Sequence, residues 1–149
     1  MLVVCGRNER VRSELATKRF SANIHMNLFG YVDNIDEFMD ASDILVSKAG
    51  GLTSAEAMAK HLPIIVVDPI PGQELRNATM IVERGAGMLA LDHHNLKYKL
   101  RMVLDDPALL GILEDAAHAL GKPQAAEAIV NDVYQRYLKR HEVLTERTP

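Results

Sequence analysis

Two short segments of this chain carry residue types that could bind a small polar molecule. The first is Lys48-Ala49-Gly50-Gly51-Leu52-Thr53, in which two glycines precede a predicted helix. Because glycine has no Cβ, a ligand can approach the backbone closely, and the free N–H groups and dipole of a helix N-terminus favour a phosphate. Gly50, Gly51, Leu52 and Thr53 are therefore a candidate phosphate cradle, with the Thr53 hydroxyl as a further donor. A plain strand-to-helix turn is the alternative.

Glu56 follows Thr53 by three residues, and that spacing has two interpretations. Thr53 and Glu56 could form a capping box at the start of a helix over 53–61. Alternatively, the Glu56 carboxylate could accept hydrogen bonds from two ribose hydroxyls. The spacing alone favours the capping box.

The second segment, Pro71-Gly72-Gln73-Glu74 followed by Asn77, places amide and carboxylate groups at another predicted helix start. Such groups suit sugar hydroxyls, which need fixed and often bidentate partners. A proline turn with a polar helix entry is the alternative. Arg7, after the first apolar run, could pair with a phosphate, although a solvated surface position is more common for a lone arginine.

Short apolar runs alternate with helical patterns along the chain. We expect strands at 2–5, 24–29, 44–46, 64–67 and 88–91, and helices at 9–18, from 35, 53–61, 73–84, 94–104, 107–120 and 123–143. This alternation predicts an α/β fold, a Rossmann-like parallel sheet with helices on both faces. In such sheets ligands bind outside the carboxyl ends of the strands, where both candidate segments lie.

Composition excludes several functional classes. The chain has 149 residues and a net charge of -3, which gives no electrostatic case for nucleic acid. Cys5 is the only cysteine, so an intramolecular disulfide and a cysteine-rich zinc site are excluded. The six histidines have no metal-site spacing, so no metal is expected. No apolar stretch reaches the roughly 20 residues of a transmembrane helix.

Several motifs in register resemble the C-terminal domain of family 28 glycosyltransferases, which have the GT-B fold and include MurG. These motifs are Ala49–Ala57, Leu62–Ile65, Pro71–Ala78 and Gly85–Gly87. Val3–Asn8 and Gly30–Val32 resemble the monogalactosyldiacylglycerol synthase and processive diacylglycerol glucosyltransferase branch more than MurG. The resemblance implies the C-terminal half of a GT-B fold over residues 1–143, lacking its first strand, and a frayed tail over 144–149.

The resemblance also implies a role for each candidate residue. Gly50, Gly51, Leu52 and Thr53 would hold the donor diphosphate, Glu56 the ribose, the backbone of Tyr31 and Val32 the uracil, and Gln73, Glu74 and Asn77 the donor sugar, with Arg7 as a further phosphate contact.

The function implied is UDP-sugar binding in an inverting, metal-independent hexosyltransferase that glycosylates a lipid, with diacylglycerol as the expected acceptor. The donor would be UDP-glucose, UDP-galactose or UDP-GlcNAc, and no cofactor is expected. The family's N-terminal domain supplies the acceptor groove and the general base. We therefore expect no catalytic residue in this chain, and no activity without that missing domain or a partner chain. The full-length enzyme is expected in the cytoplasm, peripherally at the inner face of the membrane.

Two alternatives share the architecture. One is the donor-binding subunit of a two-chain GlcNAc transferase, and the other is a fragment of a GT-B UDP-GlcNAc 2-epimerase. The Pro71–Asn77 segment favours a transferase over an epimerase.

Overall fold

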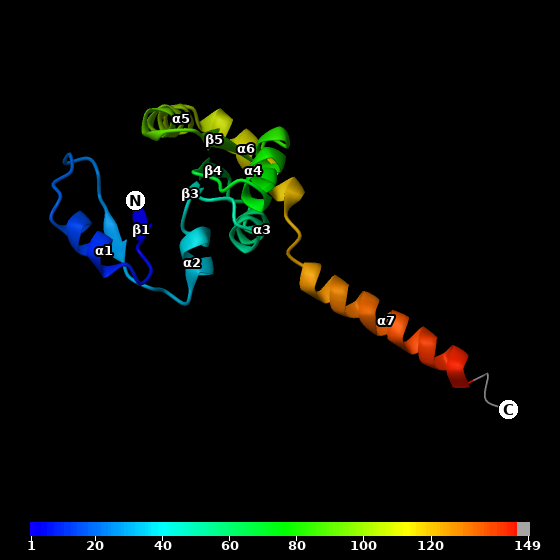
Figure 1. The fold of residues 1–149 in the computed structure, drawn as a ribbon. Helices are drawn as coiled ribbons and strands as arrows, with labels where there is room; N and C mark the ends of the chain where they lie inside the picture. Colours follow the sequence, from blue (N-terminus) through cyan, green and yellow to red (C-terminus); the bar gives the residue numbers. More distant parts are fainter. Residues whose placement is uncertain (146–149) are drawn as a thin grey trace. The chain divides into compact units, whose positions relative to one another are not determined.

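The computed structural model describes residues 1–145, and the side chains of residues 1–138. The chain forms two compact units, Met1–Ser42 and Asp43–Pro149. Every strand pairing in the described part is parallel (Figure 1), which confirms the predicted α/β class. Of the tail expected over 144–149, residues 144 and 145 belong to the last helix, and the remainder lies outside the described residues.

The smaller unit contains β1 (Leu2–Val4), α1 (Glu9–Ala16), β2 (Asn27–Phe29) and α2 (Ile35–Asp40). β1 pairs with β2, and α1 packs beside β2. The rings of Phe29 and Phe38 meet edge to face with their centroids 4.7 Å apart. Met39 is the buried apolar residue of this unit's described part. A unit of this size with so thin a core has little burial with which to offset its conformational entropy.

The second strand is shorter than the predicted run of 24–29. Only Asn27–Phe29 pairs with β1, because the Ile24 N–H donates to the Ser21 carbonyl in a turn at 2.8 Å. The alternation of apolar residues in this run therefore reflects a turn followed by a strand. The first helix also ends early, at Ala16 rather than at residue 18.

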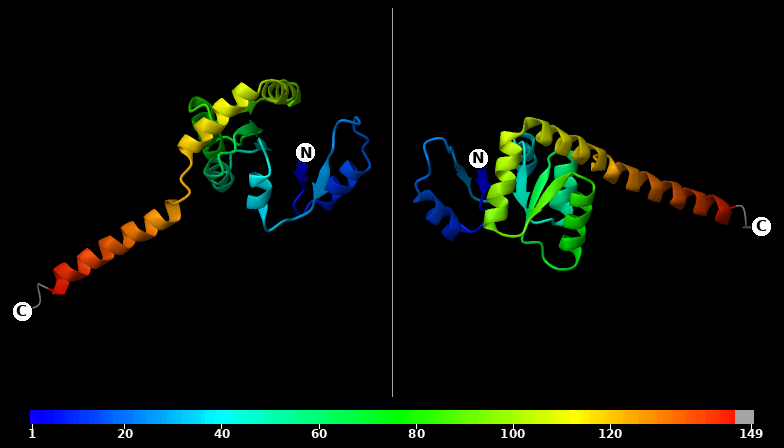
Figure 2. Two further views of the ribbon diagram at one scale, coloured as in Figure 1. Left: turned by 180° about the vertical axis from the view of Figure 1, so that it is seen from behind. Right: turned by 90° about the horizontal axis from the view of Figure 1, so that it is seen from above.

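The larger unit contains a three-stranded sheet in the order β3-β4-β5. Its elements are β3 (Leu45–Ser47), α3 (Gly51–Ala59), β4 (Ile64–Val67), α4 (Gln73–Glu83), β5 (Gly87–Ala90), α5 (His93–Asp105), α6 (Pro107–Leu120) and α7 (Ala125–Thr145). Helices α4 and α5 lie on opposite faces of this sheet (Figure 2). The arrangement agrees with the predicted doubly covered parallel sheet.

β4 is the centre of this unit's core. Ile64, Ile65 and Val66 are fully buried, as expected for a parallel strand covered on both faces. Gly87 on β5 allows the closest approach, because an added Cβ there would overlap the Ile64 carbonyl and lie 2.9 Å from Ile81 Cγ2. β4 has the bounds predicted from its sequence, since Pro63 and Asp68 flank an uninterrupted apolar run.

Side-chain caps fix the starts of two helices in this unit. The Asp106 carboxylate accepts from the N–H groups of Ala108 and Leu109, with Pro107 in the first turn, as predicted. The Asp92 carboxylate accepts from the Asn95 N–H at 2.7 Å, and this hydrogen bond holds the pKa of Asp92 below its usual value. The last helix begins at Ala125 rather than at Pro123 as predicted.

Replacing Gly87 tests the packing of β5 on β4. We expect Gly87→Ala to lower the free energy of unfolding by at least about 2 kcal/mol, because the methyl group meets backbone that cannot move aside. Gly111→Ala is the matched control. Nothing lies within 4 Å of a Cβ at Gly111 in α6, so this change should stabilise by about 0.5–1 kcal/mol through helix propensity. Urea unfolding of both variants checks the difference, and equal midpoints would contradict it.

Candidate functional site

The glycine-rich segment forms the start of α3, two residues earlier than predicted. Gly50 occupies the N-cap position with φ -63° and ψ 144°, and no side chain caps the helix. The Ser54 N–H donates to the Gly50 carbonyl at 2.9 Å, so the first turn closes around Thr53 through the backbone alone. The capping-box interpretation of Thr53 and Glu56 is therefore wrong, because Thr53 lies inside the first turn and Glu56 in the body of the helix.

This start leaves several backbone donors available. The first N–H groups of an α-helix have no partner within the helix, and here they belong to Gly51, Leu52 and Thr53. The Leu52 side chain is 81% exposed, so this turn borders solvent. Donors of this kind, at the positive end of the helix dipole, bind anions well.

The second candidate segment also forms a helix start without a side-chain cap. Gly72 precedes α4 with φ 109° and ψ -120°, a conformation that a side chain would strain. Glu74, in the first turn, accepts from the Ile70 N–H through Oε2 at 2.9 Å. One oxygen of this carboxylate thus holds the proline loop that follows β4.

A hydrogen bond ties the two helix starts together. Asn77 Nδ2 donates to the carbonyl of Ala49, a fully buried residue, at 2.9 Å. Gln73 lies close as well, because a Cβ on Gly51 would be 3.3 Å from Gln73 Nε2. The structure therefore brings four of the predicted residues, Gly50, Gly51, Gln73 and Asn77, to the carboxyl ends of β3 and β4.

The starts of α3 and α4 differ from those of α1, α5 and α6 in the residue at the N-cap. Asn8, Asp92 and Asp106 cap α1, α5 and α6 through their side chains, whereas α3 and α4 have glycine at the N-cap. A side-chain cap contributes typically ~1 kcal/mol of stability. That figure is relative to alanine, whereas glycine at the N-cap costs only a few tenths of a kcal/mol and keeps the backbone donors accessible.

The smaller unit brings Arg7 and Tyr31 together. The Arg7 guanidinium carbon lies 5.1 Å from the centre of the Tyr31 ring, a cation–π distance. Both side chains are exposed, and Val32 is half-buried. The Arg7 side chain therefore packs against the Tyr31 ring. The position of Arg7 in the sequence did not predict this contact.

Two residues near the candidate segments were not predicted. Ser54 is buried in α3, and its hydroxyl has no hydrogen-bond partner among the described residues. Asp68, directly after β4, has a left-handed backbone with φ 42°, which costs of order 1–3 kcal/mol and often accompanies a functional loop. No sequence signal identifies the Ser54 environment, while Asp68-Pro69 indicated only a turn.

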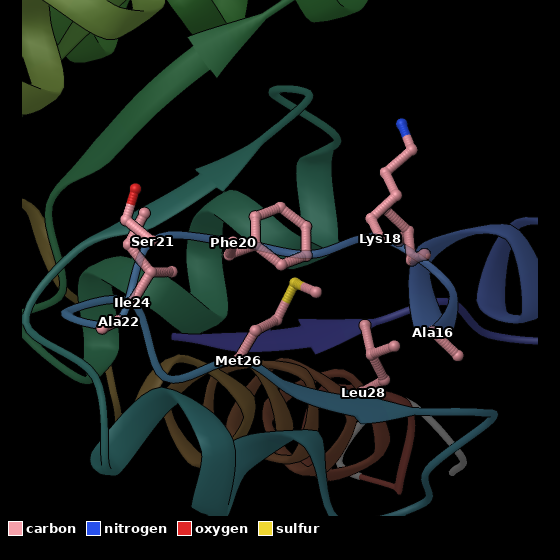
Figure 3. Close-up of a pocket in the computed structure, with 9 residues that line it drawn as sticks. Ala16, Lys18, Phe20, Ser21, Ala22, Ile24, Met26 and Leu28 are labelled. Carbon is pink, nitrogen blue, oxygen red and sulfur yellow. The ribbon is translucent and has the colours of Figure 1, made fainter.

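An open pocket of about 310 Å³ is lined by residues of the smaller unit (Figure 3). Most of its lining side chains are apolar, and they include Phe20, Ile24, Met26 and Leu28. It contains none of the predicted binding residues. In the described part of the chain, no three His, Cys, Asp or Glu side chains are arranged to hold a metal ion, and no helix there is long and apolar enough to cross a membrane.

A family model and a known relative each match most of this chain. The family model of the glycosyltransferase family 28 C-terminal domain matches residues 1–136. A processive diacylglycerol beta-glucosyltransferase of Bacillus thuringiensis (strain Al Hakam) is 32% identical over 135 residues, 91% of this chain and 35% of that protein. The chain thus spans about a third of this relative's length.

Solved structures show the same fold. MurG of Acinetobacter baumannii superposes with a TM-score of 0.75 at 18% identity, covering 91% of this chain and 41% of that one. A putative UDP-N-acetylglucosamine 2-epimerase from Listeria monocytogenes gives a TM-score of 0.62 at 17% identity, covering 93% and 45%. Since a transferase and an epimerase both superpose, the fold alone does not separate these two functions.

Asn77→Ala tests the hydrogen bond that joins the two helix starts. We expect a loss of about 1–3 kcal/mol in the free energy of unfolding, because the buried Ala49 carbonyl would lose its partner. Thr79→Ala on the same helix is the control. The exposed Thr79 hydroxyl bonds only to the Leu75 carbonyl within the helix, so its loss should change stability by less than about 0.5 kcal/mol. Similar unfolding midpoints for the two variants would contradict the assignment.

Proposed function

Because this chain belongs to glycosyltransferase family 28, as the C-terminal domain of that family, we propose that it is the donor-binding half of an inverting, metal-independent hexosyltransferase. The donor is a UDP-hexose and the acceptor is a lipid, for which the name of the relative suggests diacylglycerol. One observation carries the proposal for this site: two helix starts without side-chain caps, α3 and α4, are joined by the hydrogen bond from Asn77 to Ala49.

The diphosphate of the donor binds at the start of α3. The N–H groups of Gly51, Leu52 and Thr53 lack intrahelical partners, and Gly50 leaves space for close approach. Negative charge develops on the diphosphate as it leaves, and fixed donors at a helix N-terminus stabilise that charge without reorganising. In this proposal the helix start takes the role that a metal ion has in other transferases.

Ribose and hexose bind on either side of the diphosphate. Glu56 is exposed and is not engaged in a cap, so its carboxylate is available to two ribose hydroxyls. It follows Leu52 by four residues, which places both on one side of α3. Gln73 and the second oxygen of Glu74 bind hydroxyls of the hexose, and Asn77 holds the loop between them.

The uracil contact is assigned to the backbone of Tyr31 and Val32, with Arg7 as a further phosphate contact. This part of the proposal is supported by the family resemblance and by the cation–π contact that holds Arg7 against the Tyr31 ring. These residues belong to the smaller unit, Met1–Ser42.

In the reaction, the acceptor hydroxyl attacks the anomeric carbon as the bond to the UDP oxygen breaks, and the configuration inverts. The hydroxyl proton passes to a general base outside this chain. Activity therefore requires the other half of the enzyme, on the same polypeptide or a partner chain, and that half also meets the lipid at the cytoplasmic face of the membrane. An epimerase shares the fold, but the polar Gln73–Asn77 face beside the glycine loop favours transfer from a donor sugar.

Gly50→Ala tests the phosphate cradle with little effect on folding. The backbone of Gly50 has a conformation open to alanine, and the nearest atom to an added Cβ is Thr53 Oγ1 at 4.0 Å. We expect stability to fall by about 1 kcal/mol or less, and UDP affinity to fall about tenfold or more because the methyl group keeps the diphosphate from the N–H groups. Calorimetric titration with UDP measures this, and undiminished binding would rule out the cradle.

Glu56→Ala tests the ribose contact. Its removal should weaken UDP binding by about tenfold, the effect of losing a charge-assisted hydrogen bond. Glu83→Ala, which removes an exposed carboxylate from the last turn of α4, should leave the affinity within about twofold. Ribose 5-phosphate, which has no uracil, should also bind the Glu56→Ala variant more weakly than it binds the wild-type chain. Equal UDP affinities for both variants would exclude this role for Glu56.

A further inference from the structure

The end of α3 places a histidine where helices usually place glycine. The His61 N–H donates to the Met58 carbonyl at 3.1 Å, and the Leu62 N–H donates to the Ala57 carbonyl at 2.8 Å. This pair of hydrogen bonds ends many helices at a residue with a left-handed backbone, and that residue here is His61, with φ 59°. Glycine would adopt this conformation without strain. The helix end therefore does not require an imidazole, and a reason for one has to come from its surroundings.

The neighbour of the His61 ring is a second histidine, which belongs to another helix. The rings of His61 and His118 are tilted by 46° and have their centroids 4.0 Å apart. His118 lies in the last turn of α6, so no short spacing in the sequence links the two residues. Both side chains are exposed. Dissolved ions can therefore reach both rings.

Close backbone packing positions these two rings. α3 packs against α6, and Gly121, the C-cap residue of α6, lies against the end of α3. A Cβ added at Gly121 would overlap the Met58 carbonyl and would lie 3.2 Å from Ala59 Cα. The φ of Gly121 is -58°, which any residue can adopt, so glycine is needed here for space. The two imidazoles are thus carried by helix ends whose backbones touch.

Paired imidazoles have the chemistry of a transition-metal site. Imidazole is the commonest metal ligand in proteins and suits Zn²⁺, Cu²⁺ and Ni²⁺. Two nitrogens that share a tetrahedral Zn²⁺, with Zn–N bonds of about 2.0–2.1 Å, lie about 3.3 Å apart. Exposed rings with centroids 4.0 Å apart can reach that separation by small rotations of their side chains. The carboxyl ends of α3 and α6 also meet here, and the negative ends of their dipoles favour a cation.

We propose that His61 and His118 bind one divalent transition-metal ion of the Zn²⁺ type, and that this ion clamps the end of α3 to the end of α6. Among the described residues no third histidine, cysteine or carboxylate completes the site, so water takes the remaining positions. The site is therefore more open than the closed four-ligand sites that hold structural zinc. It lies at the opposite end of α3 from Gly51, so the ion takes no part in the proposed transfer reaction.

A second pair of histidine rings provides an internal control. His93 and His94 also have their centroids 4.0 Å apart, but they are adjacent residues in the first turn of α5. The positive end of the helix dipole lies there and disfavours a cation. An ion bound to this pair would join no two helices. Binding at His93 and His94 would therefore not clamp the fold.

Thermal unfolding of the intact chain, produced without a polyhistidine tag, measures the clamp. Zn²⁺ at about a hundredfold excess over its dissociation constant should raise Tm by about 5 °C or more, because an ion that binds only the folded state stabilises it. Mg²⁺ prefers oxygen ligands and should leave Tm unchanged. Calorimetric titration with Zn²⁺ gives the dissociation constant. In NMR spectra, the imidazole resonances of both His61 and His118 should shift as Zn²⁺ is added.

His61→Gly is the decisive variant, because its two expected effects have opposite signs. Without metal its Tm should rise, since glycine relieves the left-handed backbone, whereas the rise in Tm caused by Zn²⁺ should disappear. His118→Gln should also lose the Zn²⁺ response, with a dissociation constant at least about tenfold higher. His93→Gln is the matched control and should keep the dissociation constant within about twofold of the wild-type value. Circular dichroism verifies that each variant folds.

Four outcomes would overturn the proposal. The first is the absence of a Zn²⁺-dependent rise in the Tm of the wild-type chain. The second is a Zn²⁺ response that survives in folded His61→Gly or His118→Gln, and the third is one that His93→Gln abolishes. The fourth is an imidazole shift confined to one of His61 and His118, which would exclude a shared ion and leave ring packing as the role of the pair.

Discussion

The hydrogen bond from Asn77 to the Ala49 carbonyl is the interaction on which the candidate site depends. Ala49 is fully buried, so its carbonyl needs a partner within the protein. The partner comes from α4, 28 residues further along the chain. One bond therefore fixes the last residue before the glycine pair to the first turns of the next helix. The backbone donors of α3 and the polar side chains of α4 are held in a single geometry as a result.

Glycine occupies the N-cap position of both helices for different structural reasons. Gly72 adopts a backbone conformation closed to other residues, and Gly50 adopts one that any residue could take. Conformational need explains the first glycine but not the second. At Gly50 the absence of a side chain leaves the space beside the first N–H groups of α3 unfilled. Asn8, Asp92 and Asp106 accept from backbone N–H groups at the starts of α1, α5 and α6, whereas α3 and α4 have glycine at the N-cap.

Sequence patterns predicted the parts of the fold that local chemistry determines. β4 was predicted with correct bounds because Ile64–Val67 is a buried apolar run between Pro63 and Asp68. α6 has the predicted range, and Asp106 and Pro107 specify its first turn. The predicted start of α3 was two residues too late, because a backbone hydrogen bond from the Ser54 N–H to the Gly50 carbonyl closes the first turn without the Thr53 side chain. Asn77 was predicted as a site residue, but its partner across 28 residues was not visible in local spacing.

The division of the strands into two sheets was likewise outside the reach of local patterns. Each run predicts a strand, yet pairing depends on which neighbours are present. In the described part of the chain β1 pairs with β2 alone and β3 with β4 alone, so the predicted strands divide into a two-stranded and a three-stranded sheet.

The most direct test of the central claim is the response of individual backbone amides to UDP. In a titration of ¹⁵N-labelled chain followed by NMR, the account predicts the largest shift changes at the amides of Gly51, Leu52 and Thr53, with the Asn77 side-chain amide unmoved because it is engaged with Ala49. Inorganic diphosphate should affect the same three amides. Shift changes concentrated elsewhere in the larger unit, or their absence at concentrations that saturate binding, would contradict the account.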